Sequence, residues 1–202
     1  TIVLFTSDHG CHFKTRNAEY KRSCHESSIR VPTAIRGPGF AGGGRLRQLV
    51  SLIDLPPTLL HAAGIPVPDQ MQGRSILPLL RGQSDGWPEE VFIQISESQI
   101  GRALRTARWK YSVVAPGLNG NSAPGADHYV EEYFYDLEAD PHELTNLVSQ
   151  AAYSAIKAQL RERLIARMVA AGETAPIIEA ALEQPSGQRN AALADVRAAH
   201  TR

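Results

Sequence analysis

The side chains that could do chemistry are concentrated between residues 6 and 27, in the stretch TSDHGCHFKTRNAEYKRSCHES. Asp8 offers a hard carboxylate oxygen and His9 an imidazole nitrogen, a mixed pair that suits a divalent cation. Gly10 allows the backbone to turn closely around such an ion. Because two ligands do not hold a metal alone, further ligands have to come from elsewhere. The alternative is a turn capped by Asp8 beside an ordinary loop histidine.

Basic side chains follow this pair in the same stretch. Lys21 carries a compact ammonium next to Arg22, and Lys14 and Arg16 precede it. Cations of this kind can clamp an oxyanion beside a metal and stabilise charge that develops on it. The alternative is a solvated basic loop, in which these charges contribute little.

Two cysteines, each followed by a histidine, also lie in this stretch. Cys11-His12 and Cys24-His25 could form a Cys₂His₂ zinc site, but their spacing is not that of a zinc finger and adjacent residues rarely bind one ion together. The sequence leaves open whether the cysteines are bridged, free or bound to metal. His12 is either a group that faces a substrate or an ordinary loop histidine.

The elements before and after this stretch decide where it lies. Residues 1–5 are β-branched and aromatic without alternation, which predicts a strand buried on both faces of a parallel or mixed sheet. Ligands gather beyond the carboxyl ends of such strands, so Asp8 and His9 would lie at a binding edge. Further elements are predicted in this half: strands over 30–36 and 49–52, a helix over 54–63 that Asp54 caps, and a short helix over 75–80.

The second half of the sequence changes to β character. Strands are predicted over 91–95, 104–106, 109–114 and 129–137, with a hairpin around Ala107-Arg108, and a helix over 151–171 buries Ile156, Leu160, Leu164 and Met168. We expect the basic residues of the hairpin, Arg102, Arg105, Arg108 and Lys110, to form its solvated face, and residues 140–143 to form a turn.

Composition excludes some classes of function. The 202 residues carry 21 Lys+Arg and 21 Asp+Glu, so the net charge predicts no nucleic-acid partner. The sequence has no apolar stretch of the roughly 20 residues that a spanning helix needs, which predicts a soluble chain and no membrane partner. The compartment is not determined, and a periplasmic or secreted location of the full-length protein is compatible with the sequence.

Several motifs in order resemble the second half of the formylglycine-dependent sulfatases of the alkaline phosphatase superfamily. They are TSDHG at 6–10, YKR at 20–22, HESSIRVP at 25–32, VSLIDLPPTLLHAAGIPVPDQMQGRSILPLL at 50–80 and YFYDLEADPHELTNL at 133–147. The resemblance covers roughly residues 1 to 170, and agreement of several motifs in order is more specific than any one of them.

The resemblance implies the fold and its division. We expect an α/β chain in which residues 1–85 form the C-terminal portion of a mixed-sheet sulfatase core. Residues 86–172 would form a small antiparallel sheet with a C-terminal helix, and residues 173–202 a packing arm or partner-contact tail.

The resemblance also implies the site. Asp8 and His9 would bind a divalent metal, calcium first and magnesium as the alternative, and Lys21 would contact the sulfate during catalysis. His12, Arg22 and His25 are the expected substrate-binding residues, although many relatives carry Tyr at the position of His25. The implied partner is a sulfated small molecule or carbohydrate.

The nucleophile of this family is missing from the sequence. It is a formylglycine made from the Cys or Ser of a Cys/Ser-x-Pro-x-Arg motif, and neither Cys11 nor Cys24 stands in such a motif. We therefore expect the chain to be the C-terminal portion of a longer sulfatase, associated with the missing N-terminal part or with itself. The alternatives are a phosphodiesterase or phosphonate hydrolase of the same superfamily, and a noncatalytic remnant that binds metal or a partner.

Overall fold

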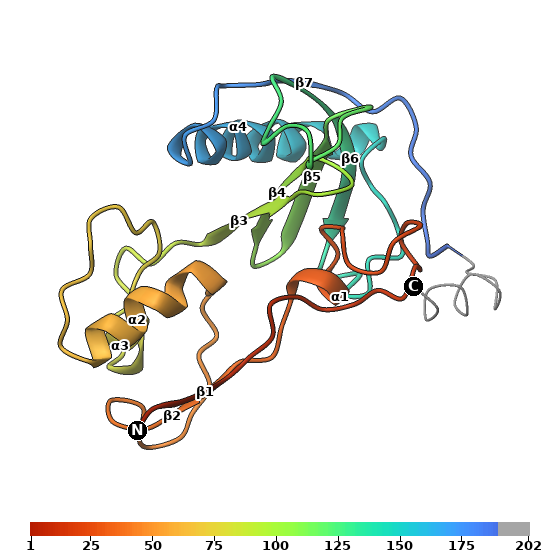
Figure 1. Ribbon diagram of the computed structural model, residues 1–202. Helices are drawn as coiled ribbons and strands as arrows, with labels where there is room; N and C mark the ends of the chain where they lie inside the picture. Colours follow the sequence, from red (N-terminus) through yellow and green to blue (C-terminus); the bar gives the residue numbers. More distant parts are fainter. Residues whose placement is uncertain (190–202) are drawn as a thin grey trace, which may run out of the picture. The chain divides into compact units, whose positions relative to one another are not determined.

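The computed structural model describes residues 1–189 (Figure 1). The chain forms two compact units, one of Thr1–Asp8 with Val31–Val91 and one of His9–Arg30 with the chain from Phe92 onward. Within the described residues, no helix has both the length and the apolar character needed to cross a membrane. The division at residues 85 and 172 stays a prediction.

The first unit begins with a two-stranded antiparallel ladder. Strand β1 (Val3–Phe5) pairs with β2 (Ala34–Arg36), and Leu4 lies opposite Ile35. The side chains of Val3 and Phe5 are 62% and 65% exposed. The prediction that this strand is buried on both faces is therefore wrong for the described residues.

Helices follow the ladder in the first unit. They are a 3₁₀ turn at Leu52–Asp54, α2 at Leu55–Ala62 and α3 at Leu77–Leu80. The strand predicted over 49–52 is wrong, because Ser51 and Asp54 form a capping box in which the Ser51 N–H donates to Asp54 Oδ2 at 2.8 Å. The helix predicted over 54–63 is confirmed by α2, and the short helix over 75–80 by α3. The predicted cap is wrong, because the Asp54 side chain makes no capping hydrogen bond to α2 and accepts instead from the Ser51 and Arg74 N–H groups.

The second unit is built on a five-stranded sheet in the order β3-β4-β5-β6-β7. Its strands are β3 (Glu90–Ile95), β4 (Gly101–Thr106), β5 (Trp109–Val114), β6 (His128–Asp136) and β7 (Ile177–Glu179). The predicted hairpin is confirmed, since Arg105 lies opposite Lys110 in the β4–β5 ladder. Strand β7 was not predicted; it runs parallel to β6 and makes the sheet mixed. The predicted α/β class is confirmed: the chain contains a mixed five-stranded sheet, whose strands β4 to β6 are antiparallel, a small antiparallel ladder of β1 and β2, and the C-terminal helix described next.

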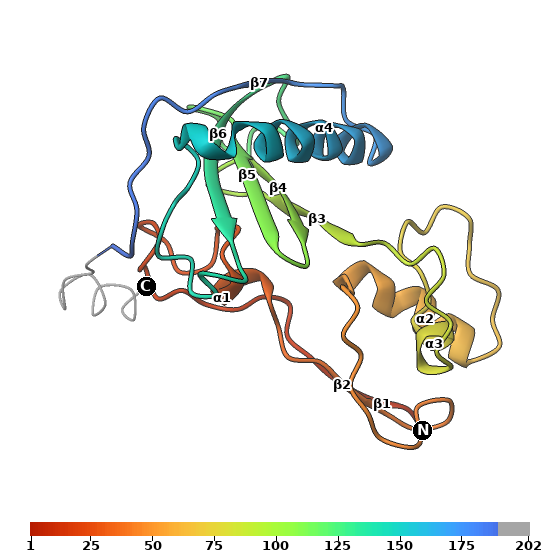
Figure 2. The ribbon, with the colours of Figure 1, turned by 180° about the vertical axis from the view of Figure 1, so that it is seen from behind.

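Helix α4 (Ser154–Ala170) covers one face of this sheet (Figures 1 and 2). Its residues Leu160, Leu164 and Met168 are almost fully buried in the same cluster as Tyr111 and Phe134, as their helical spacing predicts. Ile156, the fourth residue of that prediction, is only partly buried against the cluster. This cluster is the main hydrophobic core of the second unit. The tail predicted over 173–202 contains β7, and its residues 190–202 lie outside the described part.

The other face of the sheet is covered by residues 9–30, which include the short helix α1 (Glu26–Ile29). Here Cys24, which is 1% exposed, packs with Ile95 and Ala103. The segment that carries most of the candidate site residues is therefore fixed to the sheet face opposite α4.

Candidate functional site

Backbone hydrogen bonds hold residues 10–28 as a closed loop. The Gly10 N–H donates to the Ser28 carbonyl at 2.7 Å, and the His12 N–H donates to the Tyr20 carbonyl at 2.7 Å. A Cβ added to Gly10 would lie 2.0 Å from the Ser27 carbonyl oxygen, which is closer than any side chain allows. Glycine is therefore required where the chain passes from His9 into this loop.

His9 and Lys21 meet at the base of this loop. Lys21 Nζ lies 3.1 Å from His9 Nε2, and His9 Nδ1 lies 2.7 Å from the Gly10 carbonyl oxygen. A carbonyl only accepts hydrogen bonds, so Nδ1 carries the hydrogen and Nε2 accepts from the ammonium. The Tyr20 ring packs edge-on against His9 and under the Lys21 ammonium, 5.6 Å from its centroid. Two of the predicted site residues are thus brought together.

Arg22, the next residue, is held by carboxylates. Its guanidinium pairs with Glu97 and, at 2.5 Å, with Glu19, and these two hydrogen bonds raise its pKa above the ordinary value. Arg22 therefore fixes this part of the loop to the segment after β3. A role in substrate binding stays a prediction.

His25 belongs to the loop and is 1% exposed. Its Nδ1 lies 3.1 Å from Ser23 Oγ, its Nε2 lies 3.1 Å from the Tyr135 hydroxyl, and its ring packs edge-on against Tyr133. Burial, followed by the positive charges of Arg16 and Lys110, lowers the pKa of His25 to about 2, so the imidazole is neutral. These contacts anchor the loop to β6; direct contact with a substrate stays a prediction.

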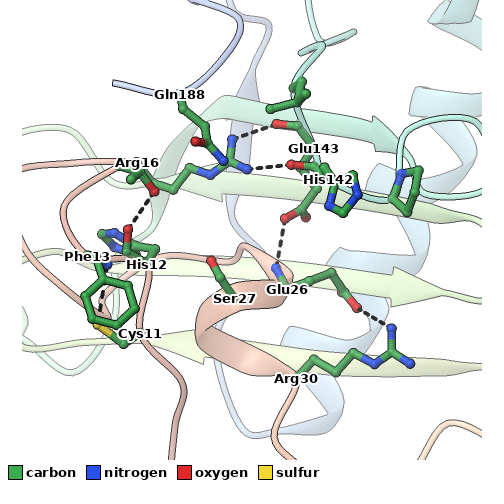
Figure 3. Close-up of a pocket in the computed structure, with 13 residues that line it drawn as sticks. Cys11, His12, Phe13, Arg16, Glu26, Ser27, Arg30, His142, Glu143 and Gln188 are labelled. Atoms are coloured by element: carbon green, nitrogen blue, oxygen red, sulfur yellow. Dashed lines mark hydrogen bonds and ion pairs between the residues drawn. The ribbon is translucent and has the colours of Figure 1, made fainter. Parts of the chain in front are cut away.

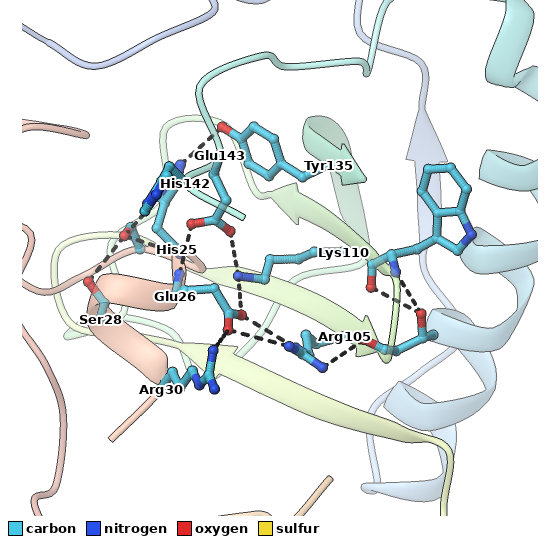
Figure 4. A network of polar contacts seen from close by, with 12 residues as sticks. His25, Glu26, Ser28, Arg30, Arg105, Lys110, Tyr135, His142 and Glu143 are labelled. Carbon is cyan, nitrogen blue, oxygen red and sulfur yellow. Dashed lines mark hydrogen bonds and ion pairs between the residues drawn. The ribbon is translucent and has the colours of Figure 1, made fainter. Parts of the chain in front are cut away.

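A buried charge network lies next to His25 (Figure 4). Lys110 is fully buried, and its Nζ lies 2.5 Å from Glu143 Oε1 and 2.8 Å from Glu26 Oε1. Arg105 adds a contact to Glu26 at 3.4 Å, and Glu143 Oε2 accepts the Glu26 N–H at 2.8 Å. Burial raises the pKa of Glu26, but Lys110 and Arg105 outweigh it, so the net pKa is below its usual value and the carboxylate is charged.

This network corrects the prediction of a solvated basic face for Lys110 and Arg102, whereas Arg108, with a side chain 53% exposed, is solvated as predicted. Lys110 is 0% exposed and Arg102 is 2% exposed, with its Nε 2.7 Å from Glu173 Oε1. The alternation along β4 and β5 could be predicted from the sequence. The burial of Lys110 and Arg102 could not, because their acidic partners Glu26, Glu143 and Glu173 are distant in sequence. The acidic segment 140–143 is a turn, as predicted.

A pocket of about 660 Å³ opens beside the network, entirely within the second unit (Figure 3). Its walls come from the loop, from α1, from the turn at 141–144 and from Gln188. His12, one of the predicted substrate-binding residues, is 2% exposed and lines this pocket. Burial lowers the pKa of His12 below its ordinary value, so its ring is neutral near pH 7.

The predicted metal ligands give a partial ligand set. Asp8 is exposed, and its Oδ1 accepts a long hydrogen bond of 3.5 Å from the Ser7 hydroxyl. The hydrogen on His9 Nδ1 leaves the Nε2 lone pair for a cation, either the Lys21 ammonium or a metal ion. Residues 1–189 contain no group of three or more His, Cys, Asp or Glu side chains placed to hold a metal. The zinc alternative therefore has no support in the described part, where Cys11 and Cys24 are free thiols.

Comparison with known sequences shows a likeness to sulfatases. A family model described as "N-sulphoglucosamine sulphohydrolase, C-terminal" matches residues 18–170. Arylsulfatase K of Rattus norvegicus is 34% identical over 160 residues, which are 74% of this chain and 27% of that protein. Arylsulfatase K of Gallus gallus is 36% identical over 157 residues, 73% of this chain and 28% of that protein. The chain thus spans little more than a quarter of these relatives.

Solved structures with the same fold agree with this result. A Bacteroides thetaiotaomicron protein described as a sulfatase superposes with a TM-score of 0.71 at 27% identity, over 98% of this chain and 43% of its own. A structure described as a complex with its substrate D-glucosamine-2-N,6-O-disulfate gives a TM-score of 0.65 at 24% identity, over 84% and 34%. The phosphonate monoester hydrolase of Silicibacter pomeroyi gives 0.68 at 22%, over 84% and 35%.

Proposed function

This chain belongs to the family of N-sulphoglucosamine sulphohydrolase C-terminal regions, and on that premise we propose that it is the C-terminal portion of a sulfatase that hydrolyses sulfate esters. The observation that carries the proposal is the contact between Lys21 Nζ and His9 Nε2 at 3.1 Å, within the motif stretch of the family. It brings an ammonium that can bind a sulfate oxygen to a residue proposed as a metal ligand.

The proposed roles follow from the chemistry of each group. Lys21 binds a sulfate oxygen and offsets negative charge as it grows on the leaving oxygen or the sulfate. His9 Nε2 is the one lone pair of the ring, because the hydrogen on Nδ1 is committed to the Gly10 carbonyl. It holds Lys21 while no metal ion is bound, and a metal ion on Nε2 would leave the Lys21 ammonium to the sulfate. Tyr20 shields one side of this pair from water.

The proposed reaction also needs a divalent metal and a formylglycine nucleophile. Asp8 and His9 would contribute to a site for a divalent metal, calcium first and magnesium as the alternative, whose other ligands lie outside the described residues. Such a metal supplies Lewis acidity, and the formylglycine supplies the nucleophile from a part of the protein outside this chain. The exposed apolar face of β1, with Val3 and Phe5, fits association with that part.

The substrate would be a sulfated small molecule or carbohydrate. The support for this is the curated relatives, which are described as arylsulfatases. The structural neighbour described with a disulfated glucosamine is 24% identical and shows the fold alone. The likeness to a phosphonate monoester hydrolase, at 22% identity, shows the fold alone and does not favour that activity.

The experiment compares Lys21→Met with Arg163→Gln in the natural polypeptide that contains this chain. Arg163 is an exposed cation on α4, at the opposite face of the sheet. The measurement is kcat/KM for an aryl sulfate, for a phosphate diester of the same phenol and for its methylphosphonate monoester. Peptide mapping tests for formylglycine. We expect Lys21→Met to lower sulfate-ester turnover by about 10²- to 10³-fold, the range for loss of one donor that stabilises a developing oxyanion.

The other outcomes of this experiment would contradict the proposal in different ways. Sulfate-ester turnover that Lys21→Met leaves unchanged would refute the role of Lys21. A preference for the phosphate or phosphonate ester would support the superfamily alternative instead. A natural protein without formylglycine and without turnover would indicate a noncatalytic remnant.

A further inference from the structure

The short connection between β3 and β4 carries a strained residue. Glu97 has a φ of 79°, in the left-handed region that residues other than glycine rarely adopt. The neighbouring chain holds it there, since the Asn121 N–H donates to the Glu97 carbonyl at 3.1 Å. A Cβ added to Gly120 would lie 2.4 Å from the Glu97 nitrogen, so glycine is required where the two segments meet. Strain that the surrounding structure enforces is concentrated at functional sites, which indicates a role for the Glu97 side chain.

The Glu97 carboxylate holds Arg22. It pairs with the Arg22 guanidinium, which also pairs with Glu19 at 2.5 Å. The hydrogen bond from Arg22 is the main cause that lowers the pKa of Glu97 below its ordinary value, and the charge of Lys21 lowers it further. Glu97 is therefore charged near neutral pH, within electrostatic range of the residue proposed to bind the sulfate.

The backbone of Arg22 is held by the same connection. Its carbonyl accepts from Gln99 Nε2 at 3.2 Å and from Asn17 Nδ2 at 2.7 Å. Gln99 lies two residues after Glu97, so the connection between β3 and β4 contacts both the side chain and the backbone of Arg22. Lys21 precedes Arg22 directly, and the position of its backbone therefore depends on these contacts.

The strain at Glu97 is not explained by stability. The Arg22 and Glu97 side chains are 25% and 50% exposed, and an ion pair at such a surface contributes little to the free energy of unfolding. A left-handed conformation at a residue with a side chain costs at least as much. Glycine at this position would remove the strain, but it would also remove the carboxylate that fixes Arg22. The strained glutamate is therefore explained by what it places.

We propose that Glu97 is a positioning residue for the reaction, which acts through Arg22 to hold the Lys21 ammonium at the proposed sulfate site. The inference rests on the proposed function for the role of Lys21 and adds the residue that keeps Lys21 in place. Because Lys21 would stabilise charge that develops only in the transition state, its misplacement should lower kcat and leave KM nearly unchanged.

The test measures kcat and KM for an aryl sulfate in the natural polypeptide, with thermal melting of each variant. Glu97→Gly removes the strain and the carboxylate, and Glu97→Gln keeps the strain and removes the charge. Glu97→Asp keeps the charge on a residue that tolerates the left-handed region. Arg22→Gln, alone and combined with Glu97→Gln, tests whether Glu97 acts through Arg22. Glu138→Gln is the matched control, because Glu138 is also an exposed carboxylate paired with an arginine, at 3.6 Å from Arg108.

We expect Glu97→Gly to lower kcat at least about tenfold, with KM within about threefold of wild type, since misplacing a catalytic group can cost about 10²-fold. Its melting temperature should be no lower than that of wild type, because relief of strain offsets the loss of an exposed ion pair. Glu97→Asp should recover part of the lost kcat, and Glu97→Gln should add no further loss once Arg22→Gln is present. Glu138→Gln should leave kcat unchanged.

Several outcomes would overturn the proposal. A merely structural role of Glu97 predicts a lower melting temperature of Glu97→Gly with kcat unchanged. A raised KM with unchanged kcat would assign the Arg22–Glu97 pair to substrate binding instead. Additive losses of kcat in Arg22→Gln and Glu97→Gln would show that Glu97 does not act through Arg22.

Hydrogen exchange separates failure of this inference from failure of the proposed function. The Ser23 N–H donates to the Lys21 carbonyl at 2.8 Å, so its exchange reports how firmly Lys21 is held, whether or not an ester is hydrolysed. If the natural protein hydrolyses no sulfate ester but this amide exchanges faster in Glu97→Gly than in Glu138→Gln, the function fails and the holding of Lys21 by Glu97 stands. If it hydrolyses the ester and Glu97→Gly changes neither kcat nor this exchange, the inference fails and the function stands.

Discussion

Lys110 provides the sharpest test of how the loop is held to the sheet. Its ammonium is 0% exposed and lies between two carboxylates, 2.5 Å from Glu143 and 2.8 Å from Glu26. Lys110→Met keeps the volume and removes the charge. Glu26 would retain Arg105 at 3.4 Å, whereas Glu143, 2% exposed, would retain the Glu26 N–H and no cation from this network.

The expected cost follows from leaving a buried carboxylate without its counter-ion. Breaking such a pair by removing one partner destabilises by about 3–5 kcal/mol, and most of this is the penalty of the charge left behind. Lys110→Met/Glu143→Gln removes both charges, and the amide oxygen of the introduced glutamine can still accept from the Glu26 N–H. The double variant should therefore recover at least about 2 kcal/mol of the loss.

Hydrogen exchange measured by mass spectrometry suits this test, because it reports local opening within a longer polypeptide. At about 1.4 kcal/mol per tenfold, amides of β5 and α1 in Lys110→Met should exchange about 10² to 10³·⁵ times faster than in wild type. A single variant within about 1 kcal/mol of wild type would refute the reasoning. So would a double variant no more stable than the single one.

Two further predictions concern the loop and the sheet face beneath it. Gly10→Ala places a Cβ 2.0 Å from the Ser27 carbonyl oxygen, so we expect the Gly10–Ser28 hydrogen bond to break and sulfate-ester kcat/KM to fall at least about tenfold. The control for alanine at a glycine is Gly125→Ala, because Gly125 has no positive φ and an added Cβ would come no closer than 3.4 Å to another atom. Burial raises the pKa of Glu132 from the ordinary value of 4.5 to about 7. Below pH 4.5 the carboxyl is protonated in both the folded and the unfolded state and does not lower the free energy of unfolding. As the pH rises from 4.5 through about 7, the unfolded state ionises first, so the free energy of unfolding falls. Glu132→Gln should match wild type in thermal melting at pH 4 and melt higher at pH 8; equal melting temperatures at both pH values would contradict this.

The hydrophobic pattern of the second unit could be predicted because it depends on local periodicity. The spacing of Leu160, Leu164 and Met168 alone defines a buried helix face, and the β4–β5 hairpin follows from two β-rich segments with a short turn. Strand β7 has only three residues, Ile177–Glu179, and exists through its parallel pairing with β6. A segment so short carries no pattern of its own.

The first unit shows a different limit. A run of apolar residues such as 1–5 predicts burial from the composition of the strand, yet Val3 and Phe5 are exposed because no other described segment covers them. At 49–52 the β propensity of the segment loses to the local hydrogen bonds between Ser51 and Asp54, which start a 3₁₀ turn. Whether a strand is buried depends on the segments that pack against it, and whether a turn forms depends on specific side-chain hydrogen bonds. The period of the apolar residues contains neither kind of information.

The candidate site combines both kinds of information. Lys21 and His9 could be named from the motif, since their types and order carry the resemblance, but the network that holds their loop could not. A lysine on a strand is ordinarily solvated, and only the turn at Glu143 and the helix at Glu26, 33 and 84 positions away along the chain, make Lys110 a buried anchor. The same three segments, the loop, α1 and the turn, form the wall of the pocket. The residues that fix the loop to the sheet therefore also shape the pocket, so changes in the network should alter ligand selection as well as stability.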